Sequence, residues 1–254
     1  MNKLGNYFNL IVRFAWADFK LKYYGSILGL FWSILKPFLM LGILYVVFYH
    51  FLKITIPNYP LFLLLGIIIW NFFSDTTKDS IGGIVSKSHL LKQINIPPIM
   101  VVISTVTHSS WSFIINLLIF LAIFFAAGLH ISLSALFLVV SIILLILLIT
   151  GVSSIVVVLF MRFKDFAHLW DVFLQLLFWA TPVVYGLNVI PSRYLWAYLL
   201  NPLSKIITDA RNSLLYGTLP SPGDLIMTVL IISAILFIGV FFFNKYSRGL
   251  IDEI

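Results

Sequence analysis

KLKYYGSILGLFWSILKPFLMLGILYVVFYHF, Lys20 to Phe51, is the stretch that decides the fold of this chain. It begins with lysines and tyrosines and becomes an apolar run from Gly29 to Leu52, in which Lys36 is the only fixed charge. A bilayer core about 30 Å thick needs about 20 apolar residues in a helix. The stretch therefore predicts a transmembrane helix that follows directly on a charged surface segment.

The composition of the whole chain supports this interpretation. Of its 254 residues, 61% are hydrophobic and 10% are charged, whereas soluble domains average about 25% charged residues. The chain contains no cysteine, which excludes disulfides and thiolate metal sites. The basic residues behind its net charge of +7 are scattered between apolar runs and form no continuous patch for nucleic acid. We therefore expect an all-α integral membrane protein that contacts membrane lipids and binds no nucleic acid.

Five further apolar runs follow the first one along the chain. They cover residues 61–73 with a polar extension to 78, 101–128, 133–161, 167–189 and 225–243, and a charged loop at 79–98 separates the first two of these. Lysine and arginine number eleven in the segments on one side of these spans and four in the loops on the other. Because cytoplasmic loops carry the excess of positive charge, we expect six transmembrane helices with both termini in the cytoplasm.

Two segments are too polar to span the bilayer. Residues 1–22 carry apolar side chains every three or four positions, which predicts an amphipathic helix that serves as a surface anchor or a docking surface. Within it, Asp18 and Lys22 have the spacing of an ion pair along one helix. Residues 203–215 divide into an apolar and a polar face, and we expect them to lie at the outer surface or to dip into it. The chain is thus one membrane domain, with an interface helix and linker at 1–28 and a six-span bundle at 29–254.

Polar residues of the fifth span form one stripe at the helical period. A charge at the centre of a span costs about 2.5–3.5 kcal/mol on insertion scales, so such residues are candidates for function. The stripe must face protein or water, and we favour the lining of a channel over a buried helix contact. It contains His168, Asp171, Gln175, Phe178, Pro182 and Tyr185.

Two faces of the first span compete for a similar role. One is an aromatic stripe suited to stacking on sugar rings, although membrane aromatics also serve packing and interfacial belts. The other carries Trp32, Lys36 and His50, and Lys36 alternatively extends to the nearby headgroups. The aromatic stripe consists of Phe31, Phe38, Tyr45 and Tyr49.

Motifs of catalysis and of ATP binding do not occur in the sequence. It contains no H-E-x-x-H, no G-x-S-x-G and no G-x-x-x-x-G-K-[ST] phosphate loop. We therefore expect a chain with no catalytic residue, no metal site and no cofactor of its own. If transport is driven by ATP, a partner subunit binds the ATP and Mg²⁺.

Several short motifs follow one another in order along nearly the whole chain. They are Tyr-Gly-Ser-x-x-Gly-x-x-Trp at 24–32, Lys-x-x-x-x-Pro at 92–97, Arg-Phe-Lys-Asp at 162–165, Thr181-Pro182 with Tyr185, and Asn201-Pro202. Their order and spacing resemble the membrane subunit of type-2 ABC exporters, in the polysaccharide-export branch. Within that branch the likeness is greatest to the Wzm-type permeases that export lipid-linked O antigen.

The resemblance implies a homodimer paired with two copies of an ABC ATP-binding subunit. It also implies that the first and fifth spans line the path of a lipid-linked polysaccharide, and that a re-entrant outer gate lies near residues 194–216. Segments 1–22 and 86–98 would dock the ATP-binding subunit, through Arg13, Asp18, Lys87, His89 and Lys92.

Charge and position suggest a further hypothesis, in which four basic residues near the cytoplasmic entrance receive the diphosphate of the substrate. They are Lys20, Lys22, Arg162 and Lys164. Other functions stay open at this point. They are export of a teichoic acid, a capsule, a drug or a lipid, an enzyme acting on lipid-linked sugars, and a proton-coupled transporter that uses His168 and Asp171.

Overall fold

The computed structural model describes residues 3–23, 29, 31–93 and 97–251, and within these ranges every regular element is a helix. Five helical segments in this part of the chain are long and apolar enough to cross a membrane. A sixth apolar helix, α7 (Phe166–Ala180), is shorter. The five are α2 with a π-helical extension (Phe31–Tyr45 and Val46–Phe51), α3 (Tyr59–Ser86), α5 (Ile99–Ala126), a 3₁₀ turn with α6 (Leu133–Leu136 and Phe137–Arg162) and α10 (Pro222–Ile251). The prediction of an all-α membrane protein is confirmed.

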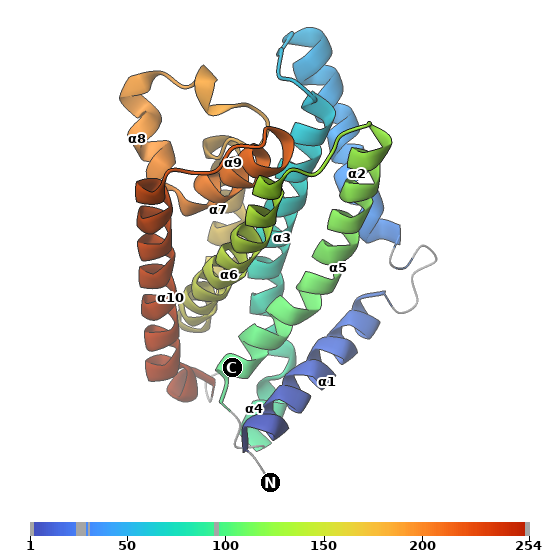
Figure 1. Cartoon of the computed structure of the whole chain (residues 1–254). Coiled ribbons are helices and arrows are strands. Elements are labelled where there is room, and N and C mark those ends of the chain that lie inside the picture. Colours follow the sequence, from blue (N-terminus) through green and yellow to red (C-terminus); the bar gives the residue numbers. More distant parts are fainter. Residues whose placement is uncertain (1–2, 24–28, 30, 94–96, 252–254) are drawn as a thin grey trace.

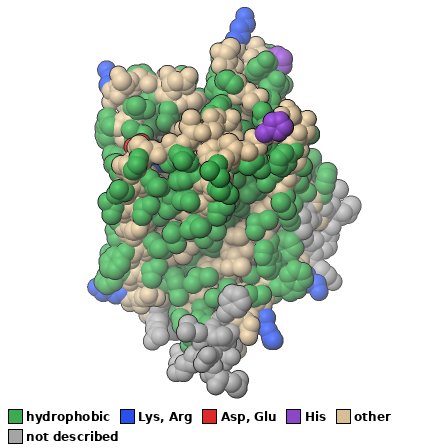
Figure 2. Space-filling model, viewed as in Figure 1, with side chains coloured by type: hydrophobic (Ala, Val, Ile, Leu, Met, Phe, Trp, Pro, Cys, Tyr) green, Lys and Arg blue, Asp and Glu red, His purple; other side chains and the backbone are tan. Residues whose placement is uncertain are grey.

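The remaining helices lie at the two ends of the bundle (Figure 1). The N-terminal helix α1 (Lys3–Tyr23) and the short α4 (Ser88–Gln93) lie at the end where α10 finishes. The turn at Leu187–Val189, α8 (Ser192–Leu200) and α9 (Pro202–Leu215) lie at the opposite end. Figure 2 shows hydrophobic side chains covering the middle of one face, with lysines and arginines near its two ends. This distribution suits a protein surrounded by lipid.

Helix α3 is the centre of the bundle. Inside the most apolar window of each span, 83% of the residues of α3 are buried, against 6% for α2. Helices α2, α5, α6, α7 and α9 all pack against α3. Because α2 buries so little within one chain, most of its surface is available to lipid or to a second copy.

Helices α6 and α10 approach each other closely at two glycines. A Cβ added at Gly151 would lie 2.8 Å from the Leu236 Cα, and one added at Gly239 would collide with the carbonyl of Gly151. Small residues at such a crossing let two membrane helices pack backbone to backbone. The contact fixes the last span against the rest of the bundle.

Three sequence-based expectations about local structure are wrong. The segment 79–98 is not a loop throughout, because α3 continues to Ser86 and α4 follows from Ser88. The i,i+4 pair of Asp18 and Lys22 does not form, because each residue pairs with a partner outside α1. Asp18 pairs with Lys87, directly after α3, and Lys22 pairs with Asp79 of α3. The polar stripe of the fifth run, which Pro182 interrupts, does not continue at the helical period to Tyr185, since α7 ends at Ala180.

The end of α7 follows from Thr181-Pro182. Proline disfavours the helical conformation of the residue before it, and Thr181 is extended, with φ −109° and ψ 138°. Helix α9 begins at Asn201-Pro202, where the Asn201 side chain accepts from the Leu203 backbone N–H at 3.1 Å and Pro202 occupies the first turn. Both are ordinary signals for a helix start. The motif Tyr24-Gly25-Ser26 lies outside the described residues.

Helix α9 is buried inside the bundle instead of lying on its outer surface. It packs against α3 and α6, and its polar residues Lys205, Asp209 and Arg211 are buried along with its apolar face. Lys205 lies 3.7 Å from Asp209 and 3.5 Å from Asp224 at the start of α10. The sequence left two positions open for residues 203–215, at the outer surface or dipping into it. The structure confirms that this segment dips inward.

Arg211 connects α9 to the non-helical chain after α7. Its guanidinium donates to the carbonyls of Phe62 (2.9 Å), Pro182 (2.6 Å) and Val183 (2.6 Å), and it lies 3.5 Å from the centre of the Phe62 ring. Gly66 of α3 leaves the necessary space, because a Cβ there would collide with the guanidinium. One buried cation thus joins α3, α9 and residues 182–183.

Replacing Arg211 with methionine should destabilise the chain strongly, because three buried carbonyls lose their donor. A hydrogen bond to a charged group is worth about 1.5–3 kcal/mol, so R211M should lose about 3 kcal/mol or more. In a chain of this size that loss lowers the thermal unfolding midpoint by roughly 10 °C. The measurement is thermal unfolding of the purified chain in detergent. R193M, at an exposed arginine of the same end, is the matched control and should shift the midpoint by about 2 °C at most; equal shifts would contradict the assignment.

Candidate functional site

Three ion pairs connect α3 to three different helices. Asp79 pairs with Lys22 of α1 at 2.7 Å, and Asp75 pairs with Lys36 of α2 at 2.8 Å. Lys78, which lies between them, pairs with Asp171 of α7 at 2.7 Å. Successive charges at positions 75, 78 and 79 therefore hold the peripheral helices to the centre of the bundle.

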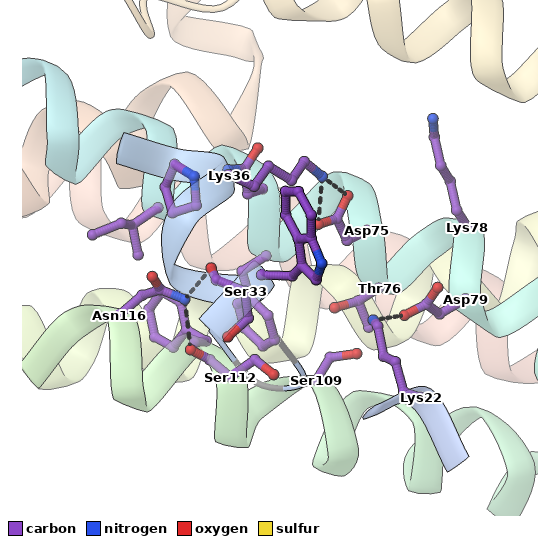
Figure 3. Close-up of a pocket in the computed structure, with 17 residues that line it drawn as sticks. Lys22, Ser33, Lys36, Asp75, Thr76, Lys78, Asp79, Ser109, Ser112 and Asn116 are labelled. Atoms are coloured by element: carbon purple, nitrogen blue, oxygen red, sulfur yellow. Dashed lines mark hydrogen bonds and ion pairs between the residues drawn. The ribbon is translucent and has the colours of Figure 1, made fainter. Parts of the chain in front are cut away.

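A cavity of about 410 Å³ lies between α2, α3 and α5, next to two of these pairs. In Figure 3 Lys36 reaches Asp75 on one side and Lys22 reaches Asp79 on another, with Thr76 between the two pairs. The floor on α5 carries Ser109, Ser112 and Asn116, and the Asn116 amide donates to the carbonyls of Ser33 (3.2 Å) and Ser112 (2.8 Å). Aromatic and apolar walls come from Trp32, Pro37, Ile68, Phe72 and Phe113.

Asp171 has a partner that the sequence did not indicate. With Lys78 at 2.7 Å, the carboxylate is neutralised by a cation of α3, and both side chains are about half exposed in the single chain. His168 and Gln175 are exposed on the same side of α7. These three polar residues lie together at the boundary between the packed face of α7 and its exposed face.

The rest of the predicted stripe lies elsewhere. Phe178 shares the packed face with Trp170 and Leu174, and its ring lies 5.4 Å from that of Trp70. Pro182 and Tyr185 follow the end of α7 and do not continue its helical period. The Tyr185 hydroxyl contacts the Trp179 carbonyl (2.5 Å) and the Tyr198 hydroxyl (3.2 Å), and burial with the bond to Tyr198 raises the pKa of Tyr185.

The aromatic stripe of the first span divides into separate parts, because α2 changes to a π-helix at Val46. Tyr45 and Tyr49 stack at 4.9 Å, and Tyr59 of α3 stacks on both at 6.3 and 6.4 Å. Phe38 is partly buried against the core, whereas Phe31 is 52% exposed. On the other face, Trp32 and Lys36 line the cavity.

The predicted docking residues fall into two groups. Asp18 and Lys87 form an internal ion pair at 2.6 Å, in which the Lys87 side chain is only 8% exposed, so they hold α1 against the junction of α3 and α4. Their contact with an ATP-binding subunit stays a prediction. Arg13, His89 and Lys92 are exposed on α1 and α4.

The four residues assigned to a diphosphate do not share one environment. Lys22 is neutralised by Asp79, and the Lys164 ammonium lies over the Phe160 ring at 5.1 Å. Lys20 and Arg162 are exposed at the end of α1 and at the end of α6. Their joint role in binding an anion stays a prediction.

Sequence reasoning missed several residues of the site. Asp75, Lys78 and Asp79 occur at helical spacing directly after an apolar run, which was a signal that the helix continues with charges on one side. Arg211 and Asn116 gave no such signal, since a single polar residue in a run does not reveal its distant partner.

The ion pair of Lys78 and Asp171 can be tested by exchange of its charges. Asp171→Asn should lower stability by about 0.5–1 kcal/mol, because a partly exposed pair contributes no more than this. The double variant Lys78→Asp with Asp171→Lys should recover most of the loss. The thermal unfolding midpoints of the unchanged chain and of these two variants measure both effects. Failure of the exchanged pair to recover stability would mean that the carboxylate acts otherwise than through Lys78.

Comparison with known proteins agrees with this architecture. The family model described as ABC-2 type transporter matches residues 9–215. The O-antigen export system permease protein RfbA of Klebsiella pneumoniae is 30% identical over 217 residues, which cover 85% of this chain and 84% of that protein. An O-antigen export system permease protein RfbA of Myxococcus xanthus is 25% identical over 211 residues, which cover 82% of this chain and 81% of that protein. The polysialic acid transport protein KpsM of Escherichia coli is 27% identical over 89% of each chain. The chain belongs to the ABC-2 type transporter family of membrane proteins.

Proposed function

We propose that this chain is the permease subunit of an ATP-driven exporter that moves a lipid-linked polysaccharide, similar to O antigen, across the cytoplasmic membrane. The observation that carries the proposal is the similarity, over more than four fifths of the chain, to permeases whose names specify O-antigen export. ATP and Mg²⁺ bind to a separate ABC subunit, which supplies the energy.

The working unit in this proposal is a homodimer with two copies of the ATP-binding subunit. Support for a second copy comes from α2, where only 6% of the residues in the most apolar window are fully buried within one chain, and from the exposed apolar side of α7 with Leu169, Val172 and Leu176. Pairing of these faces would enclose the polar residues of α7. Both termini lie in the cytoplasm, as the distribution of lysine and arginine favours.

The translocation path in this proposal runs between α2 and α7 of the two copies. Near the outer end the two helices already meet, since the Phe48 and Trp179 rings lie 6.5 Å apart. His168, Asp171 and Gln175 supply polar contacts along α7, and Tyr45, Tyr49 and Phe31 supply aromatic faces along α2. Flat aromatic faces stack on sugar rings without fixing their position, which lets a polymer slide.

A second cargo is supported by one specific observation. The polysialic acid transport protein KpsM is similar over a larger share of this chain, 89%, than the O-antigen permeases are. An exporter of a different polysaccharide with the same architecture is therefore the second candidate.

Depletion of this chain tests the proposed function. Lipid-linked polysaccharide should accumulate in the cytoplasmic leaflet while the same glycan disappears from the cell surface, because its synthesis continues without export. Mass spectrometry of the extracted lipids measures the accumulation and identifies the glycan. Normal surface glycan after depletion, with new sensitivity to small toxins, would refute the choice of cargo.

Introduction of three negative charges at exposed positions of α1 and α4 tests the docking surface. The triple variant Arg13→Glu, His89→Glu and Lys92→Glu should reduce co-purification of the ATP-binding subunit about tenfold, because like charges across an interface weaken association. Lys53→Glu, at the opposite end of the bundle, is the control and should leave co-purification unchanged. Normal recovery of the partner with the triple variant would place its docking surface elsewhere.

A further inference from the structure

A second cavity lies at the outer end of the bundle, directly beyond α2 and α7. Its volume is about 340 Å³, and most of its lining comes from three segments: residues 55–57 after the π-helical end of α2, residues 182 and 185–188 after α7, and one face of α9. The first two segments follow the helices that are proposed to line the translocation path. The cavity therefore lies where a glycan would leave that path.

The charge at this cavity is positive and is not balanced. Among the described residues that line it, only Arg211 carries a charge. The partners of its guanidinium are three carbonyls and the Phe62 ring, all of them neutral, and none of the ion pairs in the described part of the chain includes it. Charges interact over several ångströms in a protein interior. Arg211 therefore favours an anion in the cavity.

Hydrogen bonds to such an anion come from other side chains, because Arg211 is only 2% exposed and acts through its charge. Thr55 and Asn188 are exposed, and Thr208 and Asn212 are half-buried. Within the described part of the chain, these four side chains make no hydrogen bond, although all of them line the cavity. Each hydroxyl or amide can donate to an anionic oxygen. The cavity thus has accessible donors around an unbalanced positive charge.

The local structure brings these donors together with the cation. Thr208, Arg211 and Asn212 are three and four residues apart on α9, so they share one face of the helix. Gly186 leaves room for the Asn188 side chain, because a Cβ added there would lie 2.5 Å from the Asn188 Oδ1. Two separate segments therefore present amides to the same space.

The size and the charge of the cavity select one class of occupant. Its volume of about 340 Å³ lies within the range of about 300–1,000 Å³ that is typical of small-molecule sites. A carboxylate carries one negative charge and matches the single charge of Arg211, whereas a phosphate monoester carries about 1.5 to 2. The position beyond the outer ends of α2 and α7 favours the glycan as the source of this carboxylate.

We propose that this cavity binds a sugar residue of the exported glycan that carries a carboxylate. Arg211 supplies the balancing charge, and the side chains of Thr55, Asn188, Thr208 and Asn212 supply the hydrogen bonds. The inference rests on the proposed function and narrows its substrate class to glycans with acidic sugars.

Binding can be measured on the purified chain in detergent by thermal unfolding. Glucuronate, a sugar with one carboxylate, should raise the midpoint by about 3 °C at ten times its dissociation constant, because a ligand that binds only the folded chain stabilises it. Glucose, which has the same ring without the charge, and sodium chloride at the same ionic strength are the controls and should cause no shift. An equal shift with either control, or no shift with glucuronate, overturns the inference.

The variant Asn212→Asp places a carboxylate of the chain itself in the cavity. The unfolding midpoint should stay the same or rise, because the new charge balances that of Arg211. The response to glucuronate should disappear, and export of the glycan to the surface of whole cells should slow about tenfold, because like charges repel. A lowered midpoint, or a retained response to glucuronate, overturns the inference.

The matched control is Ser221→Asp, which adds the same charge at the same end of the bundle. Ser221 is exposed and does not line the cavity. Its hydroxyl accepts from the Asp224 backbone N–H at 3.1 Å, and an aspartate can keep this bond at the start of a helix. The control should export at the normal rate and respond normally to glucuronate. Equal export by the two variants overturns the inference.

The glycan that accumulates on depletion of the chain separates this inference from the proposed function. Mass spectrometry of its repeat unit should find a sugar that carries a carboxylate. If a glycan accumulates and its repeat unit has no carboxylate, the proposed function stands and this inference fails. If export continues on depletion, the proposed function fails and this inference fails with it.

Discussion

The structure depends on how the chain satisfies its backbone where it is not helical. In lipid, backbone carbonyls without partners are tolerated only where protein or a water-filled cavity surrounds them. Residues 181–184 leave the helical conformation and are buried, and Arg211 donates to the carbonyls of Pro182 and Val183. This one guanidinium permits α7 to end early and α9 to return into the bundle.

Several charged residues connect the central helix α3 to the helices that surround it. Helix α3 is held by apolar packing on nearly all sides, and α2 and α7 each add one ion pair, at Asp75 and Lys78, to their ring contacts with it. Apolar packing at native density resists small shifts. A partly exposed ion pair contributes only about 1 kcal/mol and can break and re-form. The two helices proposed to line the path, α2 and α7, thus each keep one contact with α3 that can break and re-form.

The sequence alone predicted most of the helices but not the contacts between them. Apolar runs and Thr181-Pro182 or Asn201-Pro202 marked most helices, because length and proline act locally. The end of α3 was misjudged, since Asp79 and the residues after it were assigned to a loop, whereas Asp79 lies in the helix and pairs with Lys22 of α1. Pro182 and Tyr185 were assigned to the stripe of α7 because a single helical period was extended past Ala180. Partners far apart in sequence leave no periodic signal.

Four buried polar atoms of residues around the cavity beside α2 have no hydrogen-bond partner. A buried polar group without a partner costs about 1–3 kcal/mol, and four of them would consume much of a net stability of about 5–15 kcal/mol. Each of these four atoms is almost inaccessible even to a molecule of the size of water, so nothing bound in the cavity can satisfy it. The apolar packing around α3, the most buried of the spans, must therefore offset this cost.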